Sequence, residues 1–212
     1  MKKPESKQLS LHGHHGHLEA QLSIPENLSG SVAVVCHPHP LYGGSMDNKV
    51  VHYAARALLE IGAIVLRFNF RGVGDSAGSF DDAVGEIDDC LVAVDWLQQQ
   101  YPEHSLILAG FSFGAYIATQ AAAQVSPAAL ITIAPAVNHY QFSVSERVSY
   151  PWLLIQGDDD EVVPADDVRQ WLAQTDQVSD VRWLAGAGHF FHGRLVELRT
   201  IISRWLRENL PP

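Results

Sequence analysis

The sequence is poor in cysteine and in basic residues, and each shortage excludes a class of protein. Only two cysteines, Cys36 and Cys90, occur in 212 residues, too few for the disulfide framework of a small secreted domain or for a cysteine-rich zinc site. The 14 Lys and Arg against 24 Asp and Glu give a net charge of -10, which disfavours nucleic acid as a partner because phosphate binding depends on clustered cations. We therefore expect a protein of a reducing compartment that binds no nucleic acid.

Long apolar runs are also missing. No segment approaches the ~20 apolar residues of a membrane span, and the basic start MKKPESKQLS is not followed by the apolar stretch of a secretory signal. These features predict a cytoplasmic protein without a membrane partner. No internal repeat or Gly/Ser/Pro linker divides the chain, and its length suffices for one substantial core, so residues 1–212 are expected to form a single domain.

Short apolar runs alternate with helical patterns along most of the sequence. The runs that predict strands are 31–36, 63–68, 105–110, 128–134, 152–156 and 181–185. The intervening patterns predict helices that begin after the cap residue Asp47, at Val84, at about 113, near 166 and at Leu195; Val84 is expected on the apolar face of its helix. Because the strands are continuously apolar rather than alternating, they indicate a mostly parallel sheet covered on both faces. The predicted fold class is α/β, doubly wound.

The motif with the most chemical content is Gly110-Phe111-Ser112-Phe113-Gly114, a GxSxG sequence between a predicted strand and a predicted helix. A direct turn from strand into helix strains the serine backbone and exposes its hydroxyl, and crowding by nearby backbone requires glycine at the two flanking positions. The following helix directs its amides and positive dipole end toward charge that develops at the serine. Ser112 is the candidate nucleophile. Considered by itself, the motif would also fit a serine that only caps a helix.

Two further candidates follow in the order serine, acid, histidine, each just after a predicted strand. Asp160 lies in the acidic stretch 157–164 and is our candidate acid, with Asp159 as the alternative. His189 follows a glycine loop and is the candidate base, with His192 as a weaker one. A serine hydroxyl is a poor nucleophile until an imidazole removes its proton, and the imidazole needs a carboxylate to hold its tautomer. Ser112, His189 and Asp160 are therefore predicted to form a catalytic triad.

The sequence resembles the small bacterial hydrolases of the α/β-hydrolase superfamily, relatives of dienelactone hydrolases and short-acyl esterases. The likeness spans almost all of the chain after about residue 15 and is carried by CHPHPLYGGSMDNKVV (36–51), RFNFRGVGDSAG (67–78), GFSFGA (110–115), GDDDEVVP (157–164) and GAGHFF (186–191). Dienelactone hydrolases use a cysteine nucleophile, whereas this chain has Ser112. The resemblance implies an α/β-hydrolase fold, and the short interval 135–151 predicts a minimal version without a large lid domain.

The HPHP stretch occupies the place where related enzymes carry His-Gly and form half of the oxyanion hole. Proline has no N–H to donate, so Pro38 and Pro40 are excluded. The amide of His39 is our candidate donor, with Leu41 as the alternative, and the amide of Phe113 is the second donor.

Other residues near these motifs have less certain roles. Candidates for the substrate pocket are Leu41, Tyr42, Arg71, Phe111 and Phe190. Arg71 could bind an acidic group of the substrate or pair with a nearby acid such as Asp75, and pairing is favoured. The side chains of His37 and His39 are expected to brace their loop by hydrogen bonds rather than to act in catalysis.

The cluster His12, His14, His15 and His17 lacks accompanying cysteine or acid ligands and falls in a turn between early strands, so no metal is expected there. The sequence thus predicts a serine hydrolase that cleaves a small ester, thioester or lactone through an acyl-enzyme intermediate, with a small-molecule acyl substrate as its partner and without metal or organic cofactor. The alternative is a non-catalytic binding or scaffold protein on the same fold.

Overall fold

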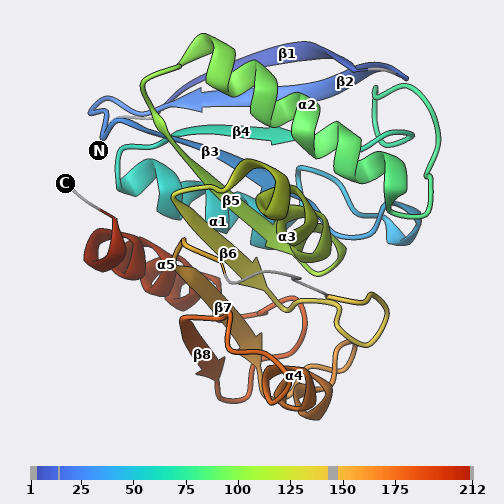
Figure 1. The fold of residues 1–212 in the computed structure, drawn as a ribbon, viewed down its shortest axis with the longest axis vertical. Helices are drawn as coiled ribbons and strands as arrows, with labels where there is room; N and C mark the ends of the chain where they lie inside the picture. The colour runs from blue at the N-terminus through green and yellow to red at the C-terminus, as the bar shows by residue number, and fades with distance from the viewer. Residues whose placement is uncertain (1–3, 14, 143–147, 211–212) are drawn as a thin grey trace.

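The computed structural model describes residues 4–13, 15–142 and 148–210, which form one eight-stranded sheet with helices on both faces (Figure 1). The strands are β1 (Glu5–Gly13), β2 (Gly16–Ile24), β3 (Ser31–Cys36), β4 (Ile64–Phe68), β5 (Ser105–Phe111), β6 (Ala129–Ile133), β7 (Trp152–Gly157) and β8 (Asp180–Leu184). The helices are α1 (Lys49–Glu60), α2 (Val84–Gln100), α3 (Phe113–Val125), α4 (Ala165–Leu172) and α5 (Leu195–Asn209), with a short 3₁₀ helix η1 (Pro40–Tyr42).

The strand order β1-β2-β4-β3-β5-β6-β7-β8 places a topological switch point beside β3. From β3 the chain crosses to β4 on one side and then to β5 on the other, and β3 to β8 all pair in parallel. Loops that leave the carboxyl ends of β3 and β5 therefore separate and open a crevice, which is where open α/β sheets place their sites. The β1–β2 hairpin adds two antiparallel strands at one edge.

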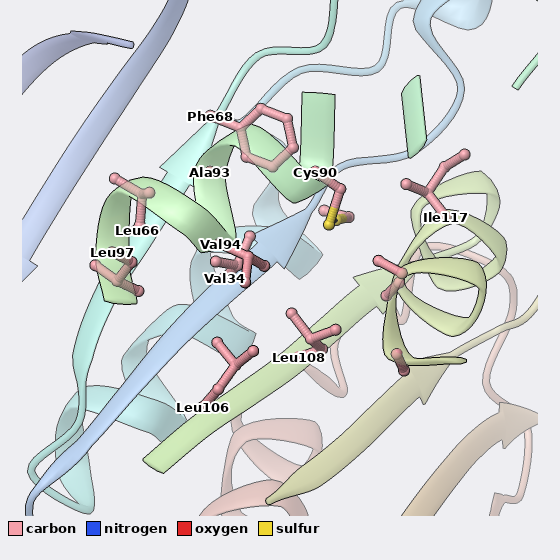
Figure 2. Packing of buried hydrophobic residues seen from close by; sticks show 14 of the residues in the cluster. Val34, Leu66, Phe68, Cys90, Ala93, Val94, Leu97, Leu106, Leu108 and Ile117 are labelled. Carbon is pink, nitrogen blue, oxygen red and sulfur yellow. The ribbon is translucent and has the colours of Figure 1, made fainter. Parts of the chain in front are cut away.

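Two apolar layers, one on each face of the sheet, form the core. Helices α2 and α3 cover one face; in Figure 2, Cys90 and Val94 of α2 and Ile117 of α3 pack over Val34 and Leu108 of the strands. The other face is covered by α1 and α5. Strands β3 to β7 are buried along almost their whole length, which explains why their sequences are continuously apolar.

The six predicted strands and five predicted helices agree with the structure to within about two residues, and the predicted α/β fold class is confirmed. The predicted cap Asp47 is wrong: Asn48 precedes α1, and its side chain accepts a hydrogen bond from the amide of Val50. Val84 was expected on the apolar face of α2 but is 68% exposed at the first position of the helix. None of the helices in the described part of the chain is long and apolar enough to span a membrane.

Candidate active site

Ser112 occupies a sharp turn between β5 and α3, with φ 56° and ψ -115°. A positive φ is unfavourable for any residue with a Cβ, so the surrounding packing must hold it. The two flanking glycines allow that packing: a Cβ on Gly110 would lie 2.0 Å from the carbonyl oxygen of Gly114, and one on Gly114 would lie 2.4 Å from that of Cys36. The strained serine predicted from the motif is therefore present, and α3 starts in direct contact with β3.

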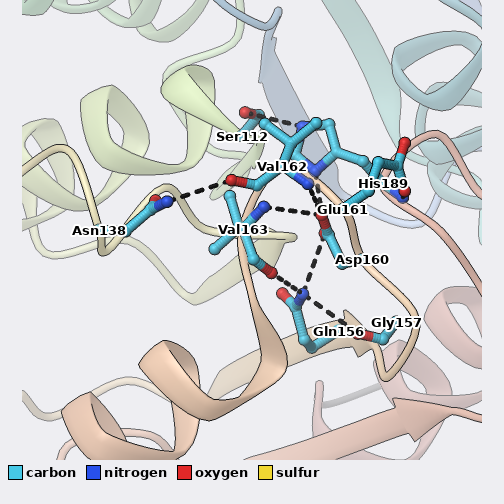
Figure 3. A network of polar contacts seen from close by, with 9 residues as sticks. All are labelled: Ser112, Asn138, Gln156, Gly157, Asp160, Glu161, Val162, Val163 and His189. Atoms are coloured by element: carbon cyan, nitrogen blue, oxygen red, sulfur yellow. Dashed lines mark hydrogen bonds and ion pairs between the residues drawn. The ribbon is translucent and has the colours of Figure 1, made fainter.

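The structure brings the three predicted triad residues into one hydrogen-bonded chain (Figure 3). Ser112 Oγ lies 3.1 Å from His189 Nε2, and His189 Nδ1 lies 2.9 Å from Asp160 Oδ2. A carboxylate only accepts hydrogen bonds, so Nδ1 donates and Nε2 is left to accept the serine proton. All three side chains are buried, and Ser112 retains 8% exposure. The arrangement has the geometry that a serine nucleophile and its general base require.

Asp160 is distinguished from the other acids of its loop by its donors. Its Oδ1 accepts from the amides of Val162 at 2.9 Å and Val163 at 2.7 Å, while Oδ2 accepts from His189. Burial raises the pKa of Asp160, but the hydrogen bonds from His189 and from the two amides outweigh it, so the pKa lies below its usual value. The alternative acid Asp159 is exposed, and the structure does not bring its carboxylate to His189. The acid that lies against His189 is the one predicted.

The loop that carries His189 is fixed by contacts on two sides. The imidazole packs against the ring of Phe111, with 5.0 Å between centroids, and its backbone amide donates to Glu161 Oε2 at 3.1 Å. Phe190 also packs against Phe111 and is 40% exposed. The weaker candidate base, His192, lies in contact with Phe190 and is exposed. Of the two histidines after β8, only His189 reaches the serine.

The segment after β3 lies against the serine turn. The His39 ring is 4.9 Å from that of Phe113, which places the two predicted oxyanion donors on neighbouring loops. The alternative donor, the amide of Leu41, is already bonded to His39 Nδ1 at 3.2 Å. In the part of the chain that the structure describes, the amides of His39 and Phe113 have no such partner. These two amides remain the better candidates.

The side chain of His37 joins the loop after β3 to the loop after β4. Its Nδ1 donates to the carbonyl of Pro38 at 2.6 Å, and its Nε2 accepts from the amide of Phe70 at 3.0 Å. Burial lowers the pKa of His37 to about 4, although the bond to Pro38 acts in the opposite direction, so the ring is neutral near pH 7. Together with the His39–Leu41 bond, this confirms the prediction that both histidines brace the loop.

Arg71 is held by acids and is only 5% exposed. It forms two bonds with Asp89, at 3.0 Å from Nε and 2.8 Å from Nη2, and lies 3.4 Å from Asp81. The predicted pairing is confirmed, but the predicted partner Asp75 is wrong. Asp89 and Asp81 lie on α2 and in the loop before it, and the sequence gives no sign that they approach Arg71. A guanidinium that is buried and paired in this way is a poor candidate for binding substrate.

The remaining pocket candidates divide by exposure. Leu41 and Tyr42 are 68% and 87% exposed on η1, whereas Phe111 is buried beneath His189. A cavity of about 790 Å³ lies elsewhere, between α1 and the β1–β2 hairpin, and includes none of the triad. The candidate site is defined by the hydrogen bonds of the triad, because reactive geometry rather than cavity volume characterises a catalytic site.

The histidine cluster near the N-terminus is divided by the hairpin. His12 and His17 pair across β1 and β2, His15 lies between the strands, and His14 is outside the described residues. Among the residues that the structure describes, no group of three or more His, Cys, Asp or Glu side chains could hold a metal ion.

Sequence reasoning missed three residues that support the triad: Gln156, Asn138 and Glu161 (Figure 3). Gln156 Nε2 donates to Asp160 Oδ2 at 3.0 Å, and Asn138 Nδ2 donates to the carbonyl of Val162 at 3.1 Å. The one available sign was a glutamine at the end of the apolar run WLLIQ, where another apolar residue is the usual choice.

Comparison with known proteins identifies the family. Residues 15–208 match the model described as X-Pro dipeptidyl-peptidase (S15 family). The chain belongs to this family. It is 44% identical to an α/β serine hydrolase without lid from Xanthomonas campestris, with 98% of this chain and 96% of that one covered and a TM-score of 0.94. An α/β serine hydrolase homologue from Coxiella burnetii is 42% identical, with 94% of this chain and 97% of that one covered, and has a TM-score of 0.90.

An uncharacterized protein of Rickettsia prowazekii is 40% identical over an alignment of 209 residues that covers 94% of this chain and 88% of the relative. The resemblance to α/β-hydrolases and the lidless fold predicted from the sequence are therefore confirmed, and this member of the S15 family is a serine hydrolase by fold and family.

Proposed function

We propose that this S15-family chain is a carboxylesterase-like acyl hydrolase that cleaves a small ester, thioester or lactone, with Ser112 as nucleophile, His189 as general base and Asp160 as the acid that orients it. The observation that carries the proposal is the chain of hydrogen bonds from Ser112 Oγ through the imidazole of His189 to Asp160 Oδ2. An imidazole oriented in this way can accept the serine proton and later protonate the leaving group.

The proposed reaction has two stages. Ser112 Oγ attacks the acyl carbon while His189 Nε2 takes its proton; the C–O or C–S bond to the leaving group then breaks, and the same proton passes to that group. Water, deprotonated by His189 Nε2, then attacks the acyl carbon; the bond from that carbon to Ser112 Oγ breaks, the proton passes from His189 to Ser112 Oγ, and the acid is released. The oxyanion that forms in each stage is bound by the amides of Phe113 and His39, close to the N-terminus of α3.

The choice of an ester over a peptide rests on exposed apolar side chains around the candidate site. Phe190 packs against His189, and Tyr42 packs against His39, which in turn packs against Phe113. Both Phe190 and Tyr42, together with Leu41, are exposed, and such apolar surface suits a small acyl group with little other recognition. The family name concerns peptidases, so the competing substrate is an X-Pro peptide. We expect p-nitrophenyl acetate or butyrate to be turned over at least tenfold faster than an X-Pro p-nitroanilide of equal concentration; the reverse ranking would assign peptidase specificity to the same serine.

The nucleophile is tested with a fluorophosphonate probe and two variants. The probe is expected to label Ser112 of the folded wild type, identified by peptide mass, and Ser112→Ala is expected to abolish labelling. Ser112→Ala and His189→Ala should each lower kcat by on the order of 10⁶, because triad members act as a unit. Circular dichroism controls for folding. A folded wild type that neither labels nor hydrolyses any ester would instead favour a non-catalytic binding or scaffold protein.

A further inference from the structure

Gln156 is a fully buried polar residue at the end of β7, four positions before Asp160. Its Nε2 lies 3.0 Å from Asp160 Oδ2, 3.1 Å from the carbonyl oxygen of Val163 and 3.2 Å from that of Gly157. Figure 3 shows the amide nitrogen between these three oxygens. Since each of them only accepts hydrogen bonds, the nitrogen end of the amide must face them. Its orientation is fixed by its surroundings.

The oxygen end of the same side-chain amide is in a different environment. Within the part of the chain that the structure describes, Gln156 Oε1 is buried and has no hydrogen-bond partner. An unpaired buried oxygen is destabilising, and an apolar side chain of similar size at this position would avoid it. The unpaired oxygen therefore disfavours a purely structural role for the glutamine, and the contact of its nitrogen with Asp160 favours a role in the triad.

That contact completes the shell of Asp160. The amides of Val162 and Val163 donate to Oδ1, and His189 Nδ1 and Gln156 Nε2 donate to Oδ2. These donors use all of the about four lone-pair sites of a carboxylate. Of the donors to Oδ2, only Gln156 belongs to the sheet, since His189 lies on a loop. A rigid donor opposite the imidazole restricts rotation of the carboxylate and keeps Oδ2 aligned with His189 Nδ1.

We propose that Gln156 is a positioning residue of the triad, which orients the carboxylate of Asp160 toward His189 and so acts on catalysis through Asp160 alone. This inference rests on the proposed function, in which Asp160 is the acid. It predicts that Gln156→Met, which preserves length and removes the donor, lowers kcat on p-nitrophenyl acetate by about tenfold, the value expected for one hydrogen bond to a charged group. KM should stay within about twofold, because no contact with substrate is lost.

The test is a double-mutant cycle that compares Gln156→Met in the wild type and in an Asp160→Asn background. If Gln156 acts through the carboxylate, the tenfold loss should disappear once Asp160 is replaced. Thr132→Val is the matched control: Thr132 is equally buried on the adjacent strand β6 and accepts a hydrogen bond from Trp152 Nε1 at 2.9 Å. Any effect of this control on kcat should be the same in both backgrounds.

An equal loss from Gln156→Met in both backgrounds, or wild-type kcat in the single variant, would overturn the inference. Gln156→Leu serves as a second variant if the methionine protein does not fold, with urea unfolding to verify each. Failure of the proposed function is a separate result: in that case Asp160→Asn alone leaves kcat unchanged. If Asp160→Asn is inactive but Gln156→Met is not impaired, the triad stands and the role of Gln156 is wrong.

Discussion

At the scale of single residues, the four consecutive acids 158–161 show how environment rather than residue type selects a role. Asp158 accepts from the amide of Gly186, Glu161 accepts from that of His189, and Asp160 alone reaches an imidazole nitrogen. Of these three acids only Asp160 is buried, whereas Asp158 and Glu161 are exposed. Their chemical similarity is what made the acid ambiguous in the sequence.

We expect Asp160→Asn to lower kcat on the order of 10⁴, and Asp159→Asn to change it less than about twofold. In Asp160→Asn an N–H group can take the place of Oδ2 beside His189 Nδ1. The imidazole then adopts the tautomer in which Nδ1 accepts and Nε2 carries the proton, so Nε2 cannot accept the proton of Ser112. The measurement is kcat on p-nitrophenyl acetate for both variants. If Asp159→Asn is the more damaging change, the assignment of the acid is wrong.

The buried His37 predicts how stability responds to acid. Burial lowers its pKa to about 4, against about 6.5 in an unfolded chain. Between these values the unfolded chain binds a proton that the native protein does not, so the free energy of unfolding falls as the pH falls through this window, by up to about 3 kcal/mol. Above about pH 6.5 His37 is neutral in both states, and this part of the free energy of unfolding is fully present.

Urea unfolding at about pH 7 and about pH 5 checks this expectation in the wild type and in His37→Gln. The variant should be less stable at the higher pH, because its bonds to Pro38 and Phe70 are lost, but its stability should depend less on pH. Parallel pH dependences in the two proteins would show that His37 is not the group that titrates.

At the scale of elements, the serine turn depends on how closely α3 approaches β3. A Cβ on Gly114 would lie 2.4 Å from the carbonyl oxygen of Cys36 and 2.5 Å from that of His37. Both are backbone atoms of buried residues, the last residue of β3 and the residue that follows it, so relieving the clash requires the backbone to shift. The same contact holds the loop of His39 against Phe113, so the packing of these elements also sets the proposed oxyanion hole.

Gly114→Ala should therefore lower the free energy of unfolding by about 3 kcal/mol and reduce kcat by more than about tenfold, since α3 must shift away from β3. Gly13→Ala is the control, because its nearest neighbour would lie at an ordinary 3.4 Å; it should change neither quantity noticeably. Urea unfolding and ester hydrolysis are measured together. Wild-type stability in Gly114→Ala would contradict this account of the turn.

At the scale of the whole molecule, we expect the surroundings of the site to limit the size of the substrate. Between β6 and β7 the described residues 134–142 and 148–151 contain neither helix nor strand, and the similar Xanthomonas campestris structure is described as lacking a lid. Methylenes beyond a short acyl group would remain in water and contribute little of the ~0.8 kcal/mol that each buried one supplies.

Hydrolysis of p-nitrophenyl esters should consequently be fastest from acetate to butyrate and fall steeply by octanoate. No jump in rate is expected when a substrate passes its solubility limit. The rates are compared at equal subsaturating concentrations across the series. A maximum at laurate or longer, or a surge on emulsified triglyceride, would mean that a deep apolar site exists.

The sequence by itself determined the alternation of strands and helices, the strained turn at Ser112 and the position of His189, because each depends on short-range patterns: apolar periodicity, flanking glycines and the place of a residue after a strand. Tertiary structure was needed to distinguish Asp160 from the alternative Asp159 as the acid beside His189, and it alone decided that Asp89 rather than Asp75 pairs with Arg71 and that Gln156 lies against Asp160. These contacts join side chains through the packing of separate loops and helices. Which polar group finds which partner depends on distances that no local pattern encodes.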